Sequence, residues 1–366
     1  MRGPLALAAA AALLLTALPA GVIRAAIPAD GVVAFGDHCT RRLYAMNPDG
    51  TGRHLLPDVG SGGVVDVSRG VGPVTVLAAG QLALPDGGSR PMLYAIDASG
   101  TKDPVALLDA SEPSPSSVVL SPTGDLVAYV HTYWDPVAGV GHADLLIGDV
   151  IRDPVSGAII DLANASFVVD LWTIGSRADT IGDGRYVFTG PLDFAPNGRR
   201  LVVTIFDDLW ELTLDPETGR TPVGSRPITR TTSFAERMPA WSPTADVVAF
   251  SGGPYSASGG GAVALYASDM NIYTADVSTG TARQVTNSKN KGSSGDGRNN
   301  PAWSRNGTYL LFDANGPAAF GKRGQSSCGS SVNTDLFQIP ADGSLKAVNV
   351  TNTSGSGVEY GPAWGW

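Results

Sequence analysis

The residues best suited to ligand chemistry are aromatic rings, imidazoles and carboxylates that gather in one short segment, with one tyrosine elsewhere. These candidate ligand-binding residues are His131, Tyr133, Trp134, Asp135, His142 and Tyr255. The rings could stack on a sugar or clamp a peptide. His131 and His142, with Asp135 or Asp144, could instead hold a metal ion. A third interpretation is that the rings only pack loops onto a scaffold while the polar groups are solvated.

Motifs of known catalytic chemistry are missing from the chain. It has no Gly-x-Ser-x-Gly elbow, no P-loop, no Gly-x-Gly-x-x-Gly following a strand and no His-Glu-x-x-His. We therefore expect no cofactor and no resident metal, and we favour binding over catalysis. The alternative is a metal-dependent lyase, lactonase or hydrolase.

Internal repetition predicts the elements that position these residues. The segments 239–250 and 301–312 both begin Pro-Ala-Trp-Ser and align without a gap, each as a strand, a tight turn and an apolar strand. Degenerate copies occur at 192–203 and 118–129. A second half-motif, such as Leu-Tyr-Ala-Ile-Asp from position 93, follows each copy and ends in a Gly-containing turn. Six four-stranded units result, and no window beyond residue 30 has a helical pattern.

The chain ends indicate how the units are arranged. The sequence stops at Pro362-Ala363-Trp364-Gly365-Trp366, an opening strand of the repeat, and the second strand begins near Val33. Together they complete one unit, which predicts a ring without exposed sheet edges. The expected fold is all-β: a six-bladed β-propeller of four-stranded blades, closed by pairing of the N- and C-terminal strands. The repeat anchors Trp241, Trp303 and Trp364 are expected in the core between blades.

The same residues carry a family resemblance. The Pro-Ala-Trp-Ser-Pro opening, the apolar second strand ending in Phe, and the Leu/Ile-Tyr strand with its Asp-Gly turn resemble the TolB-type propeller repeat. The resemblance implies six WD-like blades around a central channel, and it places the alternative enzyme activity at that channel. It does not extend to the Tol-Pal envelope protein itself, whose additional N-terminal domain has no counterpart here.

Loop lengths predict which face of the ring binds. Turns between strands one and two, and between strands three and four, are short, whereas the opposite face receives long segments at 131–142, 252–269, 287–300 and 315–333. Binding residues usually lie on long loops of a rigid scaffold, so we expect the ligand there or at the channel mouth. Cys39 and Cys328 fall on this face in neighbouring units, and we expect them to form a disulfide.

The N-terminus predicts export. Residues 1–26 combine a basic start, an apolar run from Leu5 to Leu18 and small residues at Ala20, Ala25 and Ala26, which is typical of a signal peptide. The propeller domain is expected over 27–366, in the periplasm or outside the cell, without a membrane span. The net charge of −9 argues against nucleic acid as a partner. We expect a monomer that binds a protein, peptide or glycan.

Overall fold

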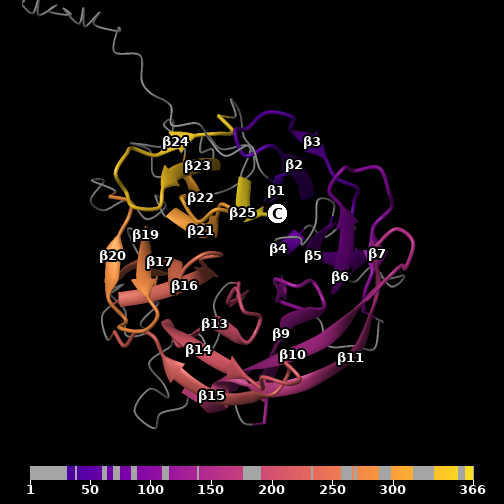
Figure 1. The fold of residues 1–366 in the computed structure, drawn as a ribbon, viewed down its shortest axis with the longest axis horizontal. Helices are drawn as coiled ribbons and strands as arrows, with labels where there is room; N and C mark the ends of the chain where they lie inside the picture. The colour runs from indigo at the N-terminus through magenta and orange to yellow at the C-terminus, as the bar shows by residue number, and fades with distance from the viewer. Residues whose placement is uncertain are drawn as a thin grey trace, which may run out of the picture.

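The structure is a computed structural model. It describes residues 31–37, 39–59, 64–68, 75–83, 89–108, 115–137, 140–175, 191–231, 234–256, 266–267, 270–287, 298–315, 334–352 and 359–365. These residues form six antiparallel sheets arranged around a central axis, which confirms the predicted six-bladed β-propeller (Figure 1). We call the sheets blades 1 to 6 in chain order.

The first three blades, with strands given from the axis outward, have these members. Blade 1 contains β25 (Glu359–Trp364), β1 (Val33–Asp37), β2 (Arg42–Met46) and β3 (His54–Leu55). Blade 2 contains β4 (Val64–Ser68), β5 (Thr75–Ala83), β6 (Ser89–Asp97) and β7 (Val105–Ala106). Blade 3 contains β8 (Ser117–Leu120), β9 (Leu126–Asp135), β10 (Val140–Arg152) and β11 (Ile159–Asp170).

The other three blades complete the ring. Blade 4 contains β12 (Asp193–Phe194), β13 (Arg200–Ile205), β14 (Asp208–Leu214) and β15 (Pro222–Pro227). Blade 5 contains β16 (Phe234–Trp241), β17 (Val247–Ser256), β19 (Asn271–Asp276) and β20 (Ala282–Gln284), and β18 (Tyr266–Ala267) pairs with β17. Blade 6 contains β21 (Arg298–Trp303), β22 (Tyr309–Asn315), β23 (Thr334–Pro340) and β24 (Val348–Asn349).

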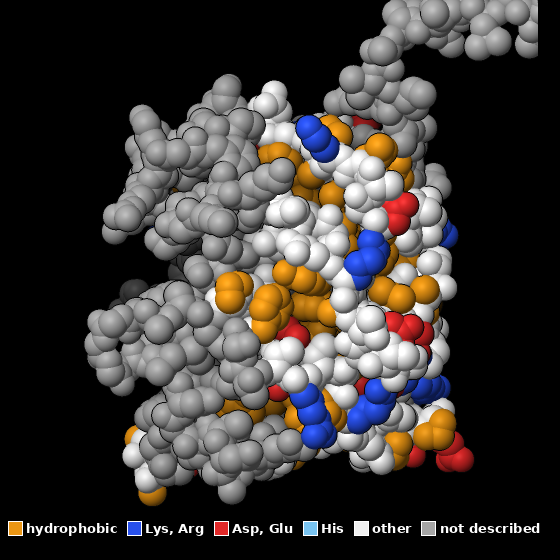
Figure 2. Space-filling model, turned by 90° about the vertical axis from the view of Figure 1, so that its left-hand side faces the viewer, with side chains coloured by type: hydrophobic (Ala, Val, Ile, Leu, Met, Phe, Trp, Pro, Cys, Tyr) orange, Lys and Arg blue, Asp and Glu red, His pale blue; other side chains and the backbone are white. Residues whose placement is uncertain are grey.

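Helix is almost absent from the described part of the chain. A single helix, α1 (Leu171–Gly175), follows β11. No helix among the described residues has the length and apolar character needed to cross a membrane. On the side shown in Figure 2, the described acidic and basic side chains are interspersed, so no broad area of one charge forms there.

The ring closes as the chain ends predicted. β25 pairs antiparallel with β1, and Val33 lies opposite Trp364 while Ala34 lies opposite Ala363. Asp313 of blade 6 accepts a hydrogen bond from the Gly361 amide at 3.1 Å, which ties the closing strand to the neighbouring blade. The first and last strands therefore share one sheet, and this sheet is fastened to blade 6.

Apolar side chains between adjacent blades make the core. Trp241 is fully buried among residues of blades 4 and 5, Trp303 lies in the cluster between blades 5 and 6, and Trp364 lies in the cluster between blades 6 and 1. Alternate residues of each strand face opposite neighbours, so Val248 packs toward blade 4 while Ala249 packs toward blade 6. Each blade is thus apolar on both faces.

The short turns follow the predicted hairpin chemistry. Gly307 closes the turn between β21 and β22 with φ of 69°. A Cβ there would lie 2.3 Å from Thr244 Oγ1 of the preceding blade, so both the backbone angle and the close approach require glycine.

One expectation about loops is wrong. The stretch 131–142 was expected to be an irregular loop, but His131 lies in β9 and His142 lies in β10, which form a long hairpin. The sequence shows no alternation of apolar and polar residues in this stretch, because the hairpin extends beyond the part of the blade that is apolar on both faces. Blade 4 also departs from the long-loop pattern, since only Phe206 and Asp207 connect β13 and β14.

Candidate functional site

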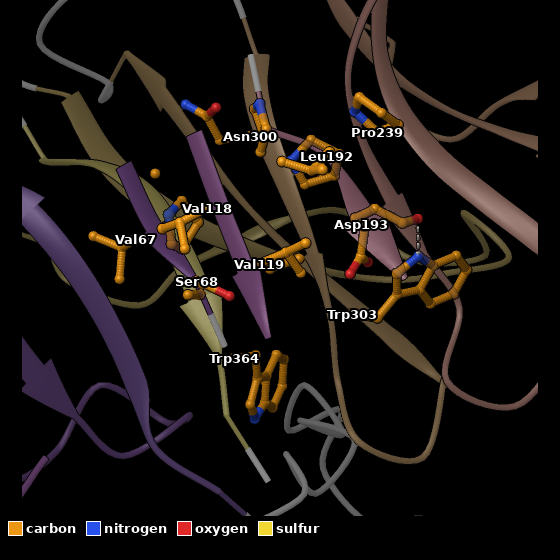
Figure 3. A pocket seen from close by; sticks show the side chains of 17 residues that line it. Val67, Ser68, Val118, Val119, Leu192, Asp193, Pro239, Asn300, Trp303 and Trp364 are labelled. Atoms are coloured by element: carbon orange, nitrogen blue, oxygen red, sulfur yellow. Dashed lines mark hydrogen bonds between the residues drawn. The ribbon is translucent and has the colours of Figure 1, made fainter. Parts of the chain in front are cut away.

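A small pocket lies on the axis of the ring, and the innermost strand or strand-entry segment of every blade contributes to it (Figure 3). Its volume is about 60 Å³. Most lining side chains are apolar, and Pro239, Pro301 and Pro362 occupy equivalent positions on three of the innermost strands. Proline suits a strand edge because it has no N–H to leave unpaired.

The polar groups of the pocket hold neighbouring blades together. Asp193 of blade 4 accepts a hydrogen bond from the Trp241 amide of blade 5 at 2.7 Å. Trp303 Nε1 donates to the Ala240 carbonyl oxygen at 2.9 Å, as the dashed line in Figure 3 marks. A pocket of this volume holds only a few water molecules. A peptide or a sugar does not fit in this volume.

Two buried carboxyl groups lie beside the starts of inner strands: Glu236 is in the inner strand β16, and Asp313 is in β22, opposite Asn299 of β21. Burial raises the pKa of Asp313 to about 6, although it accepts a hydrogen bond from Asn300 Nδ2 at 2.6 Å. The pKa of Glu236 is raised to about 8, chiefly by burial; the hydrogen bond from Thr229 opposes this rise, and Asp208 and Asp207 add to it. No basic side chain in the described part of the chain lowers the pKa of either carboxyl, so each remains costly to ionise.

A threonine at the end of the outer strand organises this region. Thr229 Oγ1 accepts a hydrogen bond from the Leu209 amide at 3.0 Å and donates to Glu236. In blade 5, Thr286 Oγ1 likewise accepts from the Ile272 amide at 2.9 Å. The repeat therefore positions a threonine hydroxyl where blade 4 passes to blade 5 and where blade 5 passes to blade 6.

An ion pair closes the same junction between blades 4 and 5. Arg237 Nε donates to Asp207 Oδ1 at 2.6 Å and its Nη2 donates to Oδ2 at 3.2 Å. Asp207 is fully buried, and both turn residues, Phe206 and Asp207, have left-handed φ angles of 52° and 62°. A two-residue turn of this conformation matches the twist of its strands. Its role here is structural.

The sequence-derived candidates meet on blade 3. His131 lies opposite Asp144, Asp144 lies opposite Asp170, and Tyr133 lies opposite His142, so these side chains share one face of three strands. We call the group of His131, Tyr133, His142, Asp144 and Asp170 the blade 3 platform. Two residues further along the strands, Tyr129 and Leu146 on this face pack in the core with blade 2.

Ring stacking and a hydrogen bond between side chains order the platform. Tyr133 stacks with His131 at a centroid distance of 5.3 Å and with His142 at 5.0 Å. His142 Nδ1 lies 2.7 Å from Asp170 Oδ2. Tyr133 nevertheless remains 42% exposed, so its aromatic ring is held in place by its neighbours and is still accessible to solvent. The platform lies where the second strand ends and the third begins, on the face that was expected to bind.

The structure gives less detail for the other candidate ligand-binding residues. Asp135 lies two positions beyond Tyr133 on the same side of β9. Trp134 lies in β9 and Tyr255 in β17, where it pairs with Ala267; only their backbones are described. Among the described residues, no three His, Cys, Asp or Glu side chains are arranged to hold a metal ion.

Sequence reasoning missed Asp170. It lies 28 positions beyond His142, at the end of a strand whose pairing is interrupted by irregularities. Only the register across β10 and β11 brings it to the platform, and no motif at that position signals it. Cys39 precedes β2, whereas Cys328 lies outside the described residues, so their disulfide stays a prediction.

Comparison with known proteins supports the fold. No protein-family profile and no curated protein matches the sequence. A candidate 6-phosphogluconolactonase from Bacteroides fragilis is similar in structure, with a TM-score of 0.52 and 12% identity over 93% of this chain and 99% of that protein. A puromycin hydrolase matches with a TM-score of 0.49 and 16% identity over 86% of this chain.

The match to puromycin hydrolase covers only 42% of that protein. The β-propeller domain of the Trilobed protease from Pyrococcus furiosus matches with a TM-score of 0.39 and 10% identity, over 78% of this chain and 71% of that one. At 12% identity the match to the Bacteroides fragilis protein supports a shared architecture and transfers no activity. The chain is a six-bladed β-propeller.

Proposed function

We propose that this chain is an exported recognition module built on a TolB-type repeat, and that it binds a protein, peptide or glycan on its long-loop face. The observation that carries the proposal is the blade 3 platform. The paired strands β9 and β10 bring His131, Tyr133 and His142 together there, and the ring of Tyr133 stays exposed. An exposed aromatic ring held in place by neighbours supplies contact area at small entropic cost.

Export and a disulfide belong to the same proposal. The signal peptide over 1–26 directs the chain to the periplasm or beyond, where Cys39 and Cys328 join blades 1 and 6. N-terminal sequencing of the secreted protein would show cleavage between Ala20 and Ala26. Peptide mass mapping without reductant would show the cross-linked cysteines, whereas two free thiols would contradict the pairing.

Ligand arrays provide the direct test of binding. The mature chain is applied to peptide and glycan arrays beside two variants, Tyr133→Ala in the platform and Leu345→Ala at another exposed apolar site. We expect Tyr133→Ala to lower binding roughly tenfold or more, and Leu345→Ala to leave it unchanged. Equal binding by all three proteins would refute the platform as the site.

The alternative function, a metal-dependent enzyme at the channel, makes a different prediction. It requires a stoichiometric metal in the purified protein, which elemental analysis detects. A bound metal together with hydrolase or lactonase turnover would replace the binding proposal.

A further inference from the structure

A second cavity opens between blades 3 and 4, on the face of the ring opposite to the blade 3 platform. Its volume is about 500 Å³, which is in the range of small-molecule sites. Short turns of the two blades and the last part of β10 line it, and the lining includes Asp125, Leu126, Asp149, Arg199, Glu217 and Arg220. The cavity and the platform lie at opposite ends of β9 and β10, so they are separate sites.

Arg199 brings a positive charge to this cavity that no neighbour neutralises by contact. Its side chain is partly buried, and its guanidinium forms no hydrogen bond or ion pair with any residue in the described part of the chain. Asp125 takes its hydrogen bonds from the hydroxyl groups of Ser121 and Thr123 instead. The N–H donors of the Arg199 guanidinium are therefore left for a ligand.

The backbone of blade 4 holds this guanidinium in place. Gly219 has a φ of 67°, and a Cβ there would clash with Arg199 Nη1 and lie 3.1 Å from Leu126 Cδ1. The turn that contains Gly219 is itself fixed, because the Gly219 amide donates to the Asp215 carbonyl oxygen at 2.8 Å and Asp215 Oδ1 accepts from the Thr218 amide at 2.8 Å. A positioned guanidinium binds an anion at a smaller entropic cost than a mobile one.

The other charged groups determine which anion fits. Arg220 of blade 4 forms an ion pair with Asp149 of blade 3, and Asp149 also accepts a hydrogen bond from Asn164 Nδ2 at 2.8 Å. Glu217 is exposed and adds a carboxylate to the lining. Two arginines and three carboxylates leave the cavity with one net negative charge. A multiply charged anion such as phosphate is therefore disfavoured, whereas a ligand that carries charges of both signs is not.

We infer that this cavity binds a small zwitterion of the amino-acid class, a free amino acid or a dipeptide, whose carboxylate pairs with Arg199 and whose ammonium group lies toward Glu217. A guanidinium pairs with a carboxylate through two parallel hydrogen bonds, which gives the contact its specificity. Leu126 offers an apolar surface for the side chain of the ligand. This site goes beyond the proposed function, because it shares no residue with the blade 3 platform.

Calorimetric titration of the mature chain tests the inference. The probes are the common amino acids, dipeptides made from them, the corresponding amines that lack the carboxylate, and inorganic phosphate. The variants are Arg199→Gln and, as a matched control, Arg305→Gln on an exposed turn of blade 6. Thermal unfolding checks that each variant is folded, and the comparison of amino acid with amine needs only the original chain.

We expect at least one amino acid or dipeptide to bind and the corresponding amine to bind roughly tenfold more weakly or not at all. Arg199→Gln should lower the affinity for that zwitterion roughly tenfold or more, and Arg305→Gln should leave it unchanged. Binding of the amine as tight as that of the amino acid would overturn the inference, as would tighter binding of phosphate or no binding of any zwitterion. None of these results would affect the proposed function of the platform.

Discussion

Replacing Glu236 by glutamine tests the electrostatics of the blade 4–5 junction. The side chain is 2% exposed, and its pKa is raised from 4.5 to about 8, chiefly by burial. Between these two pH values the folded chain holds a proton that the unfolded chain has released. The folded state therefore binds more protons than the unfolded state, and stability falls as pH rises through this interval.

The size of the effect follows from the shift. Each pKa unit corresponds to about 1.4 kcal/mol, so ionised Glu236 costs the folded state on the order of 5 kcal/mol as an upper value. Glutamine has nearly the same shape, accepts the hydrogen bond from Thr229 Oγ1 and carries no charge. The variant should match the original near pH 4.5 and exceed it in unfolding free energy by a few kcal/mol above pH 8.

Urea unfolding followed from acidic to alkaline pH measures this difference. Glu217→Gln, on an exposed turn of blade 4, provides a control for removal of one acidic charge. Its stability should differ from that of the original chain by at most about 0.5 kcal/mol at each pH. Two parallel curves for Glu236→Gln and the original chain, with no growing gap between pH 4.5 and 8, would refute the assignment of a buried, neutral Glu236.

Three further changes test how the blades are joined. Arg237→Ala leaves Asp207 buried without its ion pair, so urea unfolding should show a loss of about 3–5 kcal/mol, and a loss below about 1 kcal/mol would contradict the pairing. Trp364→Ala removes a buried ring from the closing strand and should cost about 3–5 kcal/mol; a near-neutral effect would mean that closure does not depend on it. Thr286→Val leaves the Ile272 amide without its acceptor and should cost about 1–3 kcal/mol, while an unchanged midpoint of thermal unfolding would argue against this role.

The ring could be predicted because its evidence is local and repeated. Each copy of the Pro-Ala-Trp strand comes with the turn and the apolar strand that pair with it, so the hairpins follow from short-range pattern. The closing pair of Val33 and Trp364 extends the same pattern across the chain ends. The repeat pattern alone is therefore enough to predict the blades and the strand that closes the ring, without knowing which other side chains lie beside them.

The platform depends on such positions. Blade 3 is one of the copies in which the repeat is degenerate, and the ladder between β10 and β11 changes register at three points. Each irregularity can move later side chains to the other face of the strand, so alternation could not place Asp170 beside Asp144. Segment composition could identify His131, Tyr133 and His142 as candidates, but only pairing between strands assembles them.

The two buried glutamates, Glu236 and Glu359, occupy a position that the repeat itself defines. Glu236, Arg298 and Glu359 stand at the same distance before the three repeat tryptophans, so their shared position could be identified from the repeat alone. What that position does depends on neighbours that the repeat does not specify. Arg53 forms an ion pair with Glu359 and lowers its pKa against the effect of burial.

At the blade 4–5 junction Arg237 follows Glu236 directly in the chain, and its guanidinium is bonded to Asp207 instead. Glu236 accepts the threonine hydrogen bond, no basic side chain in the described part of the chain forms an ion pair with it, and burial is the chief cause that raises its pKa to about 8. One repeat position thus supports a glutamate paired with an arginine in blade 1 and a glutamate whose pKa is raised to about 8 at the blade 4–5 junction. Repeats therefore predict where polar groups lie better than they predict which groups pair with them.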